Sequence, residues 1–129
     1  MTNSYIARLT NPSDVAFWVS RDTFCEKCDQ SDFRCREVLH VDIIFSQQWF
    51  EDNENGQLCF LLPTVRLASG KTEFINGRHR TAVLLSTCNR VPIAFAGPDA
   101  VSFAESLALN RIAAEREIQL PDLEIVNNI

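Results

Sequence analysis

Short apolar runs separated by turn-forming residues organise most of this chain. Five of them are rich in β-branched or aromatic residues and predict strands at 4–9, 38–45, 58–67, 72–75 and 91–96. Pro63 should interrupt the third strand or place it at a sheet edge, because proline cannot donate to a β-ladder. Turn signals at 52–56 and at Ser69-Gly70-Lys71 bound the neighbouring strands, and the second predicts a hairpin.

Helical spacing and capping residues predict the remaining elements. The helices expected are a short one from Asn11-Pro12 to about Asp22, one from Ser46 through Phe50, one from about Arg78 to Thr87 and a long acidic one from about Asp99 to Ile118. Residues 23–35 are expected to form a loop and residues 119–129 a loosely held tail. This order predicts a single α+β domain over residues 1–129, with a mixed sheet, packed helices and a core at about 36–118.

Composition restricts the classes of function. The net charge is -5 and the sequence pI is near 4.9, so the chain lacks the excess of Lys and Arg that drives non-specific nucleic-acid binding. No apolar run approaches the roughly 18 residues of a membrane span. The N-terminal residues carry no signal-peptide pattern. We therefore expect a cytoplasmic protein with no membrane partner, in which the five cysteines are thiols or metal ligands.

The densest group of candidate functional residues is the Gly77 turn and the predicted helix start after it, Arg78-His79-Arg80-Thr81. A helix N-terminus presents unpaired N–H groups and the positive end of the helix dipole, which disfavours cations. Three cations there indicate an anionic ligand, and phosphate is the usual one. Gly77 allows close approach of the ligand to the backbone. The alternative is that these side chains only decorate an exposed helix start.

Five short motifs lie in order between Val38 and Ala96. They are Val41-Asp42-Ile43-Ile44, Thr64-Val65-Arg66-Leu67, Glu73-Phe74-Ile75, Gly77-Arg78-His79-Arg80-Thr81-Ala82 and Val91-Pro92-Ile93. Together they resemble the ParB/sulfiredoxin superfamily, whose Gly-x-His-Arg-x-Ala turn opens a helix and holds nucleotide phosphates. The resemblance implies that Gly77, Arg78, His79, Arg80 and Thr81 bind a nucleotide, ATP or CTP with Mg²⁺.

Two departures limit what the resemblance implies. Arg78 stands where sulfiredoxins have their catalytic cysteine, which excludes sulfinic acid reduction by that thiol. ParB proteins have a longer Gly-Glu-Arg-Arg-x-Arg-Ala turn, and they add a helix-turn-helix and a dimerisation domain that this chain is not expected to hold. What remains resembles stand-alone cores of the superfamily, which include free serine kinases, reported nucleases and plasmid-encoded fertility-inhibition factors with ATPase activity.

Nucleotide hydrolysis, phosphotransfer or nuclease activity would need a carboxylate that holds a metal or orients a nucleophile. Asp42 lies near where family members place acidic or polar residues, and Glu73 lies in the strand before the turn. His79 would join the arginines in stabilising charge on the phosphates. Asp52 and Glu54 lie in a loop that could fold over the site. For each carboxylate, the alternative is an ordinary solvated side chain.

Three cysteines have a spacing that resembles a metal site, Cys25-x2-Cys28-x6-Cys35. A zinc site needs a fourth ligand, which His40 or Cys59 could supply, but the usual second close pair is missing. A redox-active pair and ordinary buried thiols are the alternatives.

The aromatic residues and the acidic surface leave two further alternatives. Five aromatic side chains are expected in the core, with stacking on a nucleotide base as the alternative for one of them: Phe17, Trp18, Trp49, Phe50 and Phe60. The rival function is a non-enzymatic interaction protein that uses the fold as a platform. It would bind a protein partner through its acidic surface and the long acidic helix, which carries Glu105, Glu115 and Glu117.

Overall fold

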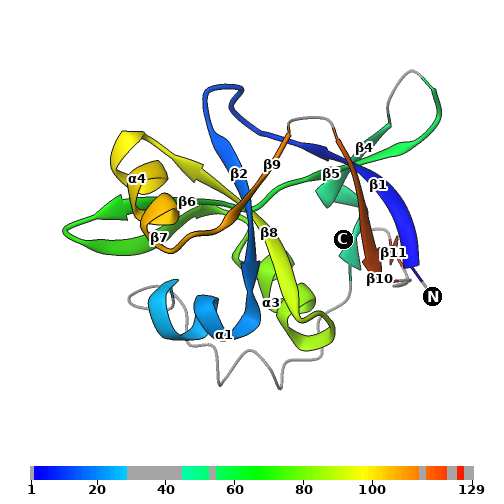
Figure 1. The fold of residues 1–129 in the computed structure, drawn as a ribbon. Coiled ribbons are helices and arrows are strands. Elements are labelled where there is room, and N and C mark those ends of the chain that lie inside the picture. Colours follow the sequence, from blue (N-terminus) through cyan, green and yellow to red (C-terminus); the bar gives the residue numbers. More distant parts are fainter. Residues whose placement is uncertain (1, 29–44, 53–54, 114–115, 122–124, 127–129) are drawn as a thin grey trace.

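The computed structural model describes residues 2–28, 45–52, 55–113, 116–121 and 125–126, and its strands form two mixed sheets and a short parallel pair (Figure 1). The four-stranded sheet has the order β10-β1-β5-β4, built from β1 (Thr2–Arg8), β4 (Phe50–Asp52), β5 (Leu58–Leu61) and β10 (Glu117–Pro121). The five-stranded sheet has the order β7-β6-β8-β2-β9, built from β2 (Val15–Ser20), β6 (Thr64–Ala68), β7 (Lys71–Asn76), β8 (Arg90–Ala96) and β9 (Asn110–Ile112). The short pair joins β3 (Phe45–Ser46) to β11 (Ile125–Val126).

Helical turns connect these strands, which confirms the predicted α+β class. The short ones are α1 (Arg21–Thr23), the π-helical turn η1 (Phe24–Cys28) and the 3₁₀ turn η2 (Gln47–Trp49). The longer ones are α3 (Arg78–Thr87) and α4 (Pro98–Ser106). Residues 23–28, predicted as a loop, are therefore helical. The rest of that loop and residues 38–44 of the predicted strand lie outside the described residues.

The predicted strand 58–67 is two strands that belong to different sheets. β5 ends at Leu61 and β6 begins at Thr64, so the chain crosses between the sheets at Leu62 and Pro63. The Leu62 N–H donates to the carbonyl of Arg8 at 2.9 Å, and the Ala94 N–H donates to the carbonyl of Pro63 at 2.8 Å. Pro63 itself has no N–H to give to a ladder. The crossing is therefore fastened to both sheets, at Arg8 in β1 and at Ala94 in β8.

The hairpin and the helix after it have the predicted form. Ser69 and Gly70 have φ values of 52° and 75°, as a type I′ turn requires, and they join β6 to β7 with Ala68 opposite Lys71. α3 has the predicted bounds, and its inner face buries Ala82, Val83 and Leu85 as expected; Leu84 is buried with them.

The helix predicted from Asn11 is wrong. The Asn11 side chain accepts hydrogen bonds from the N–H and the hydroxyl of Ser13, at 3.1 and 2.9 Å, so it closes a turn. The following segment is β2, which pairs with β8 on one side and β9 on the other. Asn-Pro starts turns as well as helices, and the β-branched and aromatic residues after it favour a strand.

The long acidic helix predicted from Asp99 to Ile118 is also wrong. α4 ends at Ser106, and the chain turns at Ala108, whose φ is 57°. β9 then pairs with β2 and β10 with β1, and β11 pairs with β3. Residues 117–118 were predicted to end the helix, and residues 119–121 and 125–126 to belong to a loosely held tail. All of them lie in strands. Glu105 stays on α4 and Glu117 lies in β10, while Glu115 lies outside the described residues.

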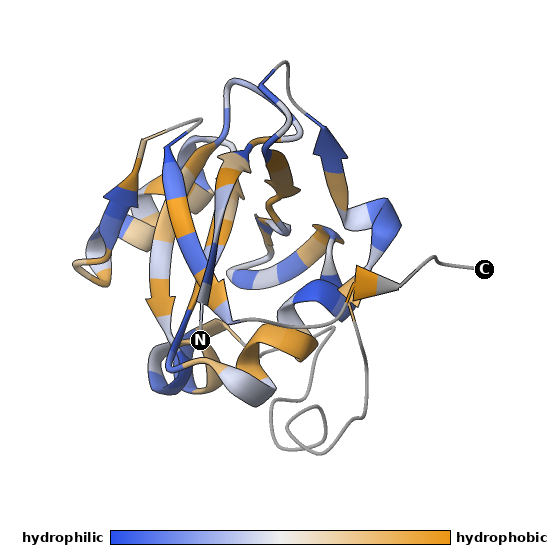
Figure 2. Cartoon of the chain, turned by 90° about the vertical axis from the view of Figure 1, so that its right-hand side faces the viewer, coloured by the Kyte–Doolittle hydropathy of each residue, from blue (hydrophilic) through white to orange (hydrophobic). Residues whose placement is uncertain are grey.

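The core lies along the inner faces of both sheets, and Figure 2 shows hydrophobic and hydrophilic residues alternating along several strands. Phe17 packs edge-on against Phe95, with ring centroids 5.5 Å apart, inside the five-stranded sheet. A second aromatic cluster joins Tyr5, Phe45, Phe50 and Phe60 under the four-stranded sheet. Phe17, Phe50 and Phe60 are buried as predicted, and Trp18 and Trp49 are partly buried. Within the described parts of the chain, the helices are too short or too polar to cross a membrane.

Candidate oxyanion site

A single glycine turns the chain from β7 into α3. Gly77 has a φ of +88°, a left-handed conformation that side chains rarely adopt. A Cβ atom on Gly77 would lie 2.5 Å from the Cα and Cβ atoms of Pro63 and 2.9 Å from a guanidinium nitrogen of Arg80. The turn therefore lies directly against the crossing between the two sheets, and both the backbone conformation and the space require glycine.

Among the described residues, the N-terminus of α3 lacks two features that usually neutralise a helix start. Gly77 offers no side-chain cap, and the first turn contains no acidic residue. The first hydrogen bond of the helix runs from the Thr81 N–H to the Gly77 carbonyl at 3.0 Å, and the Thr81 hydroxyl donates to the same carbonyl. The N–H groups of His79 and Arg80 precede that bond and have no acceptor within the helix. By contrast, α4 carries Asp99 in its first turn, which is the usual arrangement.

The Arg80 side chain points into the protein, and its hydrogen bonds hold the Gly77 turn in place. Its side chain is only 7% exposed, and its two terminal nitrogens donate to the carbonyl of Leu61 at 2.6 Å and to Oδ1 of Asn76 at 2.7 Å. Its Nε is buried without a hydrogen-bond partner. Arg80 makes no ion pair with any residue that the structure describes. Burial lowers the pKa of Arg80 to about 10, so the group stays charged at neutral pH.

The three cations of the motif are thus separated. Arg78 and His79 are exposed at the start of α3, whereas Arg80 is buried beneath it. The sequence predicted that both arginines would hold phosphate oxygens directly. In the structure, the guanidinium of Arg80 is hydrogen-bonded to Leu61 and Asn76. Arg80 can therefore contribute its positive charge and its backbone N–H, but not a direct contact from these side-chain nitrogens. Sequence reasoning did not identify Leu61, Pro63 and Asn76 as the residues that contact Arg80 and Gly77.

The structure describes two of the four candidate carboxylates, Glu73 and Asp52. Glu73 lies opposite Arg66 in the β6–β7 ladder and forms an ion pair with it. Further along the ladder, a register shift between Thr64 and Val65 places Asn76 opposite Thr64. Asp52 is exposed at the end of β4, in the other sheet, while Asp42 and Glu54 lie outside the described residues. Metal-holding or water-orienting roles for Asp42 and Glu73 stay predictions.

The cysteines differ in oxidation state. Cys25 is disulfide-bonded, whereas Cys28, Cys59 and Cys88 form no disulfide. The expectation that all cysteines would be thiols or metal ligands is therefore wrong for Cys25. Over the described ranges, there is no group of three Asp, Glu, His or Cys side chains placed to hold a metal ion.

A zinc site at Cys25, Cys28 and Cys35 stays a prediction. It requires Cys25 in its reduced form, because a disulfide offers no thiolate to a metal. Cys35 and His40 lie outside the described residues.

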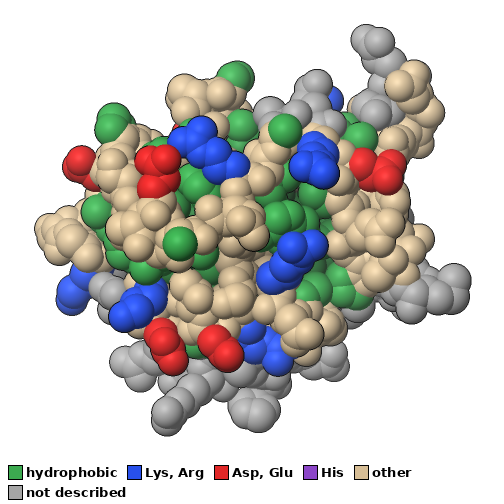
Figure 3. Space-filling view, viewed as in Figure 1, with side chains coloured by type: hydrophobic (Ala, Val, Ile, Leu, Met, Phe, Trp, Pro, Cys, Tyr) green, Lys and Arg blue, Asp and Glu red, His purple; other side chains and the backbone are tan. Residues whose placement is uncertain are grey.

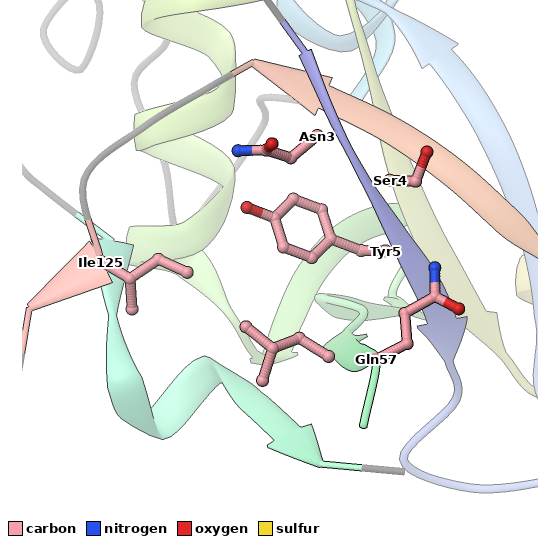
Figure 4. A pocket seen from close by; sticks show the side chains of 6 residues that line it. Asn3, Ser4, Tyr5, Gln57 and Ile125 are labelled. Carbon is pink, nitrogen blue, oxygen red and sulfur yellow. The ribbon is translucent and has the colours of Figure 1, made fainter. Parts of the chain in front are cut away.

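Away from this turn, a groove of about 440 Å³ opens beside the four-stranded sheet (Figure 4). It is lined by uncharged side chains only: Asn3, Ser4, Tyr5, Gln57, Leu58 and Ile125. Sequence reasoning did not identify this groove, because nothing local places strand residues 3–5 beside residues 57–58 and 125. Its neutral lining makes it a poor oxyanion site. In the view of Figure 3, Lys and Arg side chains alternate with Asp, Glu and apolar ones, so the described residues form no continuous basic surface on this face.

No known family model, curated protein or solved structure matches this chain.

Proposed function

We propose that this chain binds a phosphate-bearing ligand, a nucleotide such as ATP or CTP with Mg²⁺, at the start of α3. One observation carries the proposal: an N-terminus with no acid in its first turn and no side-chain cap adjoins a buried Arg80 that forms no ion pair with any residue the structure describes. Each cation near a helix N-terminus is unfavourable by about 0.3–1 kcal/mol, and a buried charge without a counter-charge is unfavourable as well. A bound phosphate would offset both effects.

Backbone groups, exposed side chains and the buried Arg80 would contribute to binding in different ways. The N–H groups of His79 and Arg80 would donate to phosphate oxygens, and the exposed side chains of Arg78 and His79 would contact the ligand from the solvent side. Arg80 would act through its charge and by fixing the Gly77 turn. A ParB/sulfiredoxin-like core belongs to the same proposal and is supported by the motif order between Val38 and Ala96.

Binding is better supported than any one reaction. Hydrolysis, phosphotransfer and nuclease activity all need a carboxylate near the phosphates, and Glu73 is engaged by Arg66. Asp42 remains the candidate for that role. The rival function, binding of a protein partner, cannot use a long acidic helix, because α4 ends at Ser106. Partner binding through the acidic surface of the fold stays the alternative proposal.

The test is a thermal-shift titration with ATP, CTP and inorganic phosphate, with and without Mg²⁺. A ligand at a hundred times its Kd stabilises the folded state by about 2.7 kcal/mol. We expect this stabilisation in the wild type and its loss in a double variant, Arg78→Gln with His79→Gln. Lys71→Gln is the matched control, because Lys71 is an exposed cation at the far end of β7, roughly 20 Å from Gly77. No shift with any of these ligands, or equal shifts in the double variant, would contradict the proposal.

A second assay separates binding from reaction. Asp42→Asn should keep the thermal shift and lose release of phosphate from ATP or CTP, if Asp42 holds the metal or orients water. Phosphate release that persists in Asp42→Asn at the wild-type rate would remove Asp42 from the mechanism without affecting the binding proposal.

A further inference from the structure

The residue before the Gly77 turn makes an uncharged contact with the buried Arg80. Asn76 is the last residue of β7, and its Oδ1 atom accepts a hydrogen bond from a terminal guanidinium nitrogen of Arg80 at 2.7 Å. Arg80 is 7% exposed and forms no ion pair within the described ranges of the chain. The amide of Asn76 therefore satisfies one guanidinium nitrogen and leaves the positive charge of Arg80 uncompensated.

Asn76 is followed by glycine, which is the neighbour that most readily lets an asparagine side chain react with the backbone. Gly77 has no Cβ atom to hinder approach to its nitrogen, and Asn76 and Gly77 are both partly exposed, so water can reach them. The Arg80 guanidinium donates to Oδ1, the atom on which negative charge collects when a nucleophile attacks the side-chain carbonyl. A donor in that position stabilises the charge as it develops. The sequence and the Arg80 contact together favour reaction at Asn76.

We propose that Asn76 is a deamidation site, and that its conversion to a carboxylate closes the oxyanion site at the start of α3. The backbone nitrogen of Gly77 attacks the side-chain carbonyl carbon of Asn76, and the amide C–N bond breaks as ammonia leaves with the proton of that nitrogen. Water then adds to a carbonyl carbon of the cyclic succinimide and breaks its bond to the Gly77 nitrogen, which regains a proton. The product is aspartate or isoaspartate, and water is the co-reactant.

Both products place a negative charge next to the Gly77 turn. In aspartate, one carboxylate oxygen keeps the position of Oδ1, so the contact with Arg80 becomes an ion pair. In isoaspartate, the main chain also becomes longer at a turn that packs closely against Pro63. The charge of Arg80 is then compensated from within the protein, and an incoming phosphate meets a like charge. This closure rests on the proposed function, because it requires an anion site at the start of α3.

Peptide mapping tests the reaction without reference to binding. Asn-Gly occurs twice in the chain, and the exposed Asn55-Gly56 pair serves as an internal reference. The full-length protein is incubated at mildly alkaline pH and digested with trypsin, which places Asn76 on the peptide 72–78 and Asn55 on the peptide 37–66. Mass spectrometry locates each amide that has become a carboxyl group, and an unincubated sample corrects for conversion during digestion.

We expect peptide 72–78 to be converted while the protein is folded. If peptide 72–78 stays unmodified while peptide 37–66 is converted, the proposal is overturned.

The effect on binding is tested by placing the carboxylate directly. By isothermal titration with inorganic phosphate and with ATP and Mg²⁺, Asn76→Asp should bind about tenfold or more weakly than the wild type, because like charges are brought together. Asn55→Asp is the matched control, since it adds the same charge at an exposed turn and should bind as the wild type does. The deamidated fraction of the incubated wild type, separated by anion exchange, provides the same measurement without relying on a variant that folds.

The outcomes separate this proposal from the proposed function. Wild-type affinity in Asn76→Asp and in the deamidated fraction would overturn closure of the site. If the unmodified wild type binds neither phosphate nor ATP, the proposed function fails, and closure of the site fails with it. The peptide map still decides whether Asn76 is a deamidation site, because its result does not depend on a ligand.

Discussion

Replacing Gly77 with alanine tests how closely the turn before α3 approaches the crossing between the sheets. Alanine at a φ of +88° is strained, and its Cβ would lie 2.5 Å from the backbone Cα of Pro63. Pro63 cannot move away freely, because its carbonyl accepts the Ala94 N–H at 2.8 Å. Gly77→Ala therefore combines a conformational penalty with a steric one.

The two penalties can be estimated separately. A left-handed conformation is unfavourable by about 1–2 kcal/mol for a residue with a side chain. Forcing an extra methyl group into filled space is unfavourable by about 1–3 kcal/mol. Gly77→Ala should thus lower the free energy of unfolding by roughly 2–5 kcal/mol, out of about 5–15 kcal/mol for a typical domain.

Two other glycines provide matched controls. Gly70 and Gly56 have φ values of +75° and +78°, but a Cβ on either would meet nothing within 4 Å. Gly70→Ala and Gly56→Ala should therefore lose only about 1–2 kcal/mol. The assay is urea denaturation followed by circular dichroism, with equal m values required for the comparison. If Gly77→Ala is no more destabilising than Gly70→Ala, the close approach to Pro63 is refuted.

Three further predictions concern two buried groups, Arg80 and Asp14, and the partly buried Cys88. Arg80→Lys keeps the charge but cannot reach both Leu61 and Asn76, so the free energy of unfolding in urea should fall by about 1.5–3 kcal/mol; unchanged stability would count against these bonds. Burial raises the pKa of Asp14, so the free energy of unfolding of the wild type falls as pH rises through that pKa. Asp14→Asn should therefore be more stable than the wild type at neutral pH and should have no advantage below the ordinary pKa of 3.8. A difference in unfolding free energy that does not change with pH would contradict this. Burial is also the main cause of a raised pKa at Cys88, so iodoacetamide should label the peptide 81–90 slowly until the pH exceeds the ordinary 9.0, and rapid labelling at neutral pH would show an accessible thiolate.

The parts of the fold that could be predicted depend on local signals. Gly77 and the helical pattern after it gave the bounds of α3, Ser69-Gly70 gave the hairpin, and Pro63 marked a real interruption. In each case, a backbone conformation or a missing N–H acts within a few residues. Such constraints can be recognised in the adjacent sequence without knowledge of the tertiary structure.

The errors arose where distant pairing decides the structure. The spacing of Phe103, Leu107 and Ile112 suits a helix, yet β9 and β10 are strands because β2 and β1, about a hundred residues earlier, offer open edges to pair with. The same holds at the candidate site. The motif identifies three cations at a helix start, but only the position of the Leu61 carbonyl determines that Arg80 turns inward.

The most direct test of the account is a titration of ¹⁵N-labelled protein with ATP and Mg²⁺, followed by the backbone amide resonances. Binding at the start of α3 predicts that the largest shifts occur at His79 and Arg80, whose N–H groups have no acceptor within the helix, and at Thr81, whose N–H forms the first helical hydrogen bond. The central claim is contradicted if these amides do not respond, or if the largest shifts occur instead at Asn3 and Gln57 in the neutral groove.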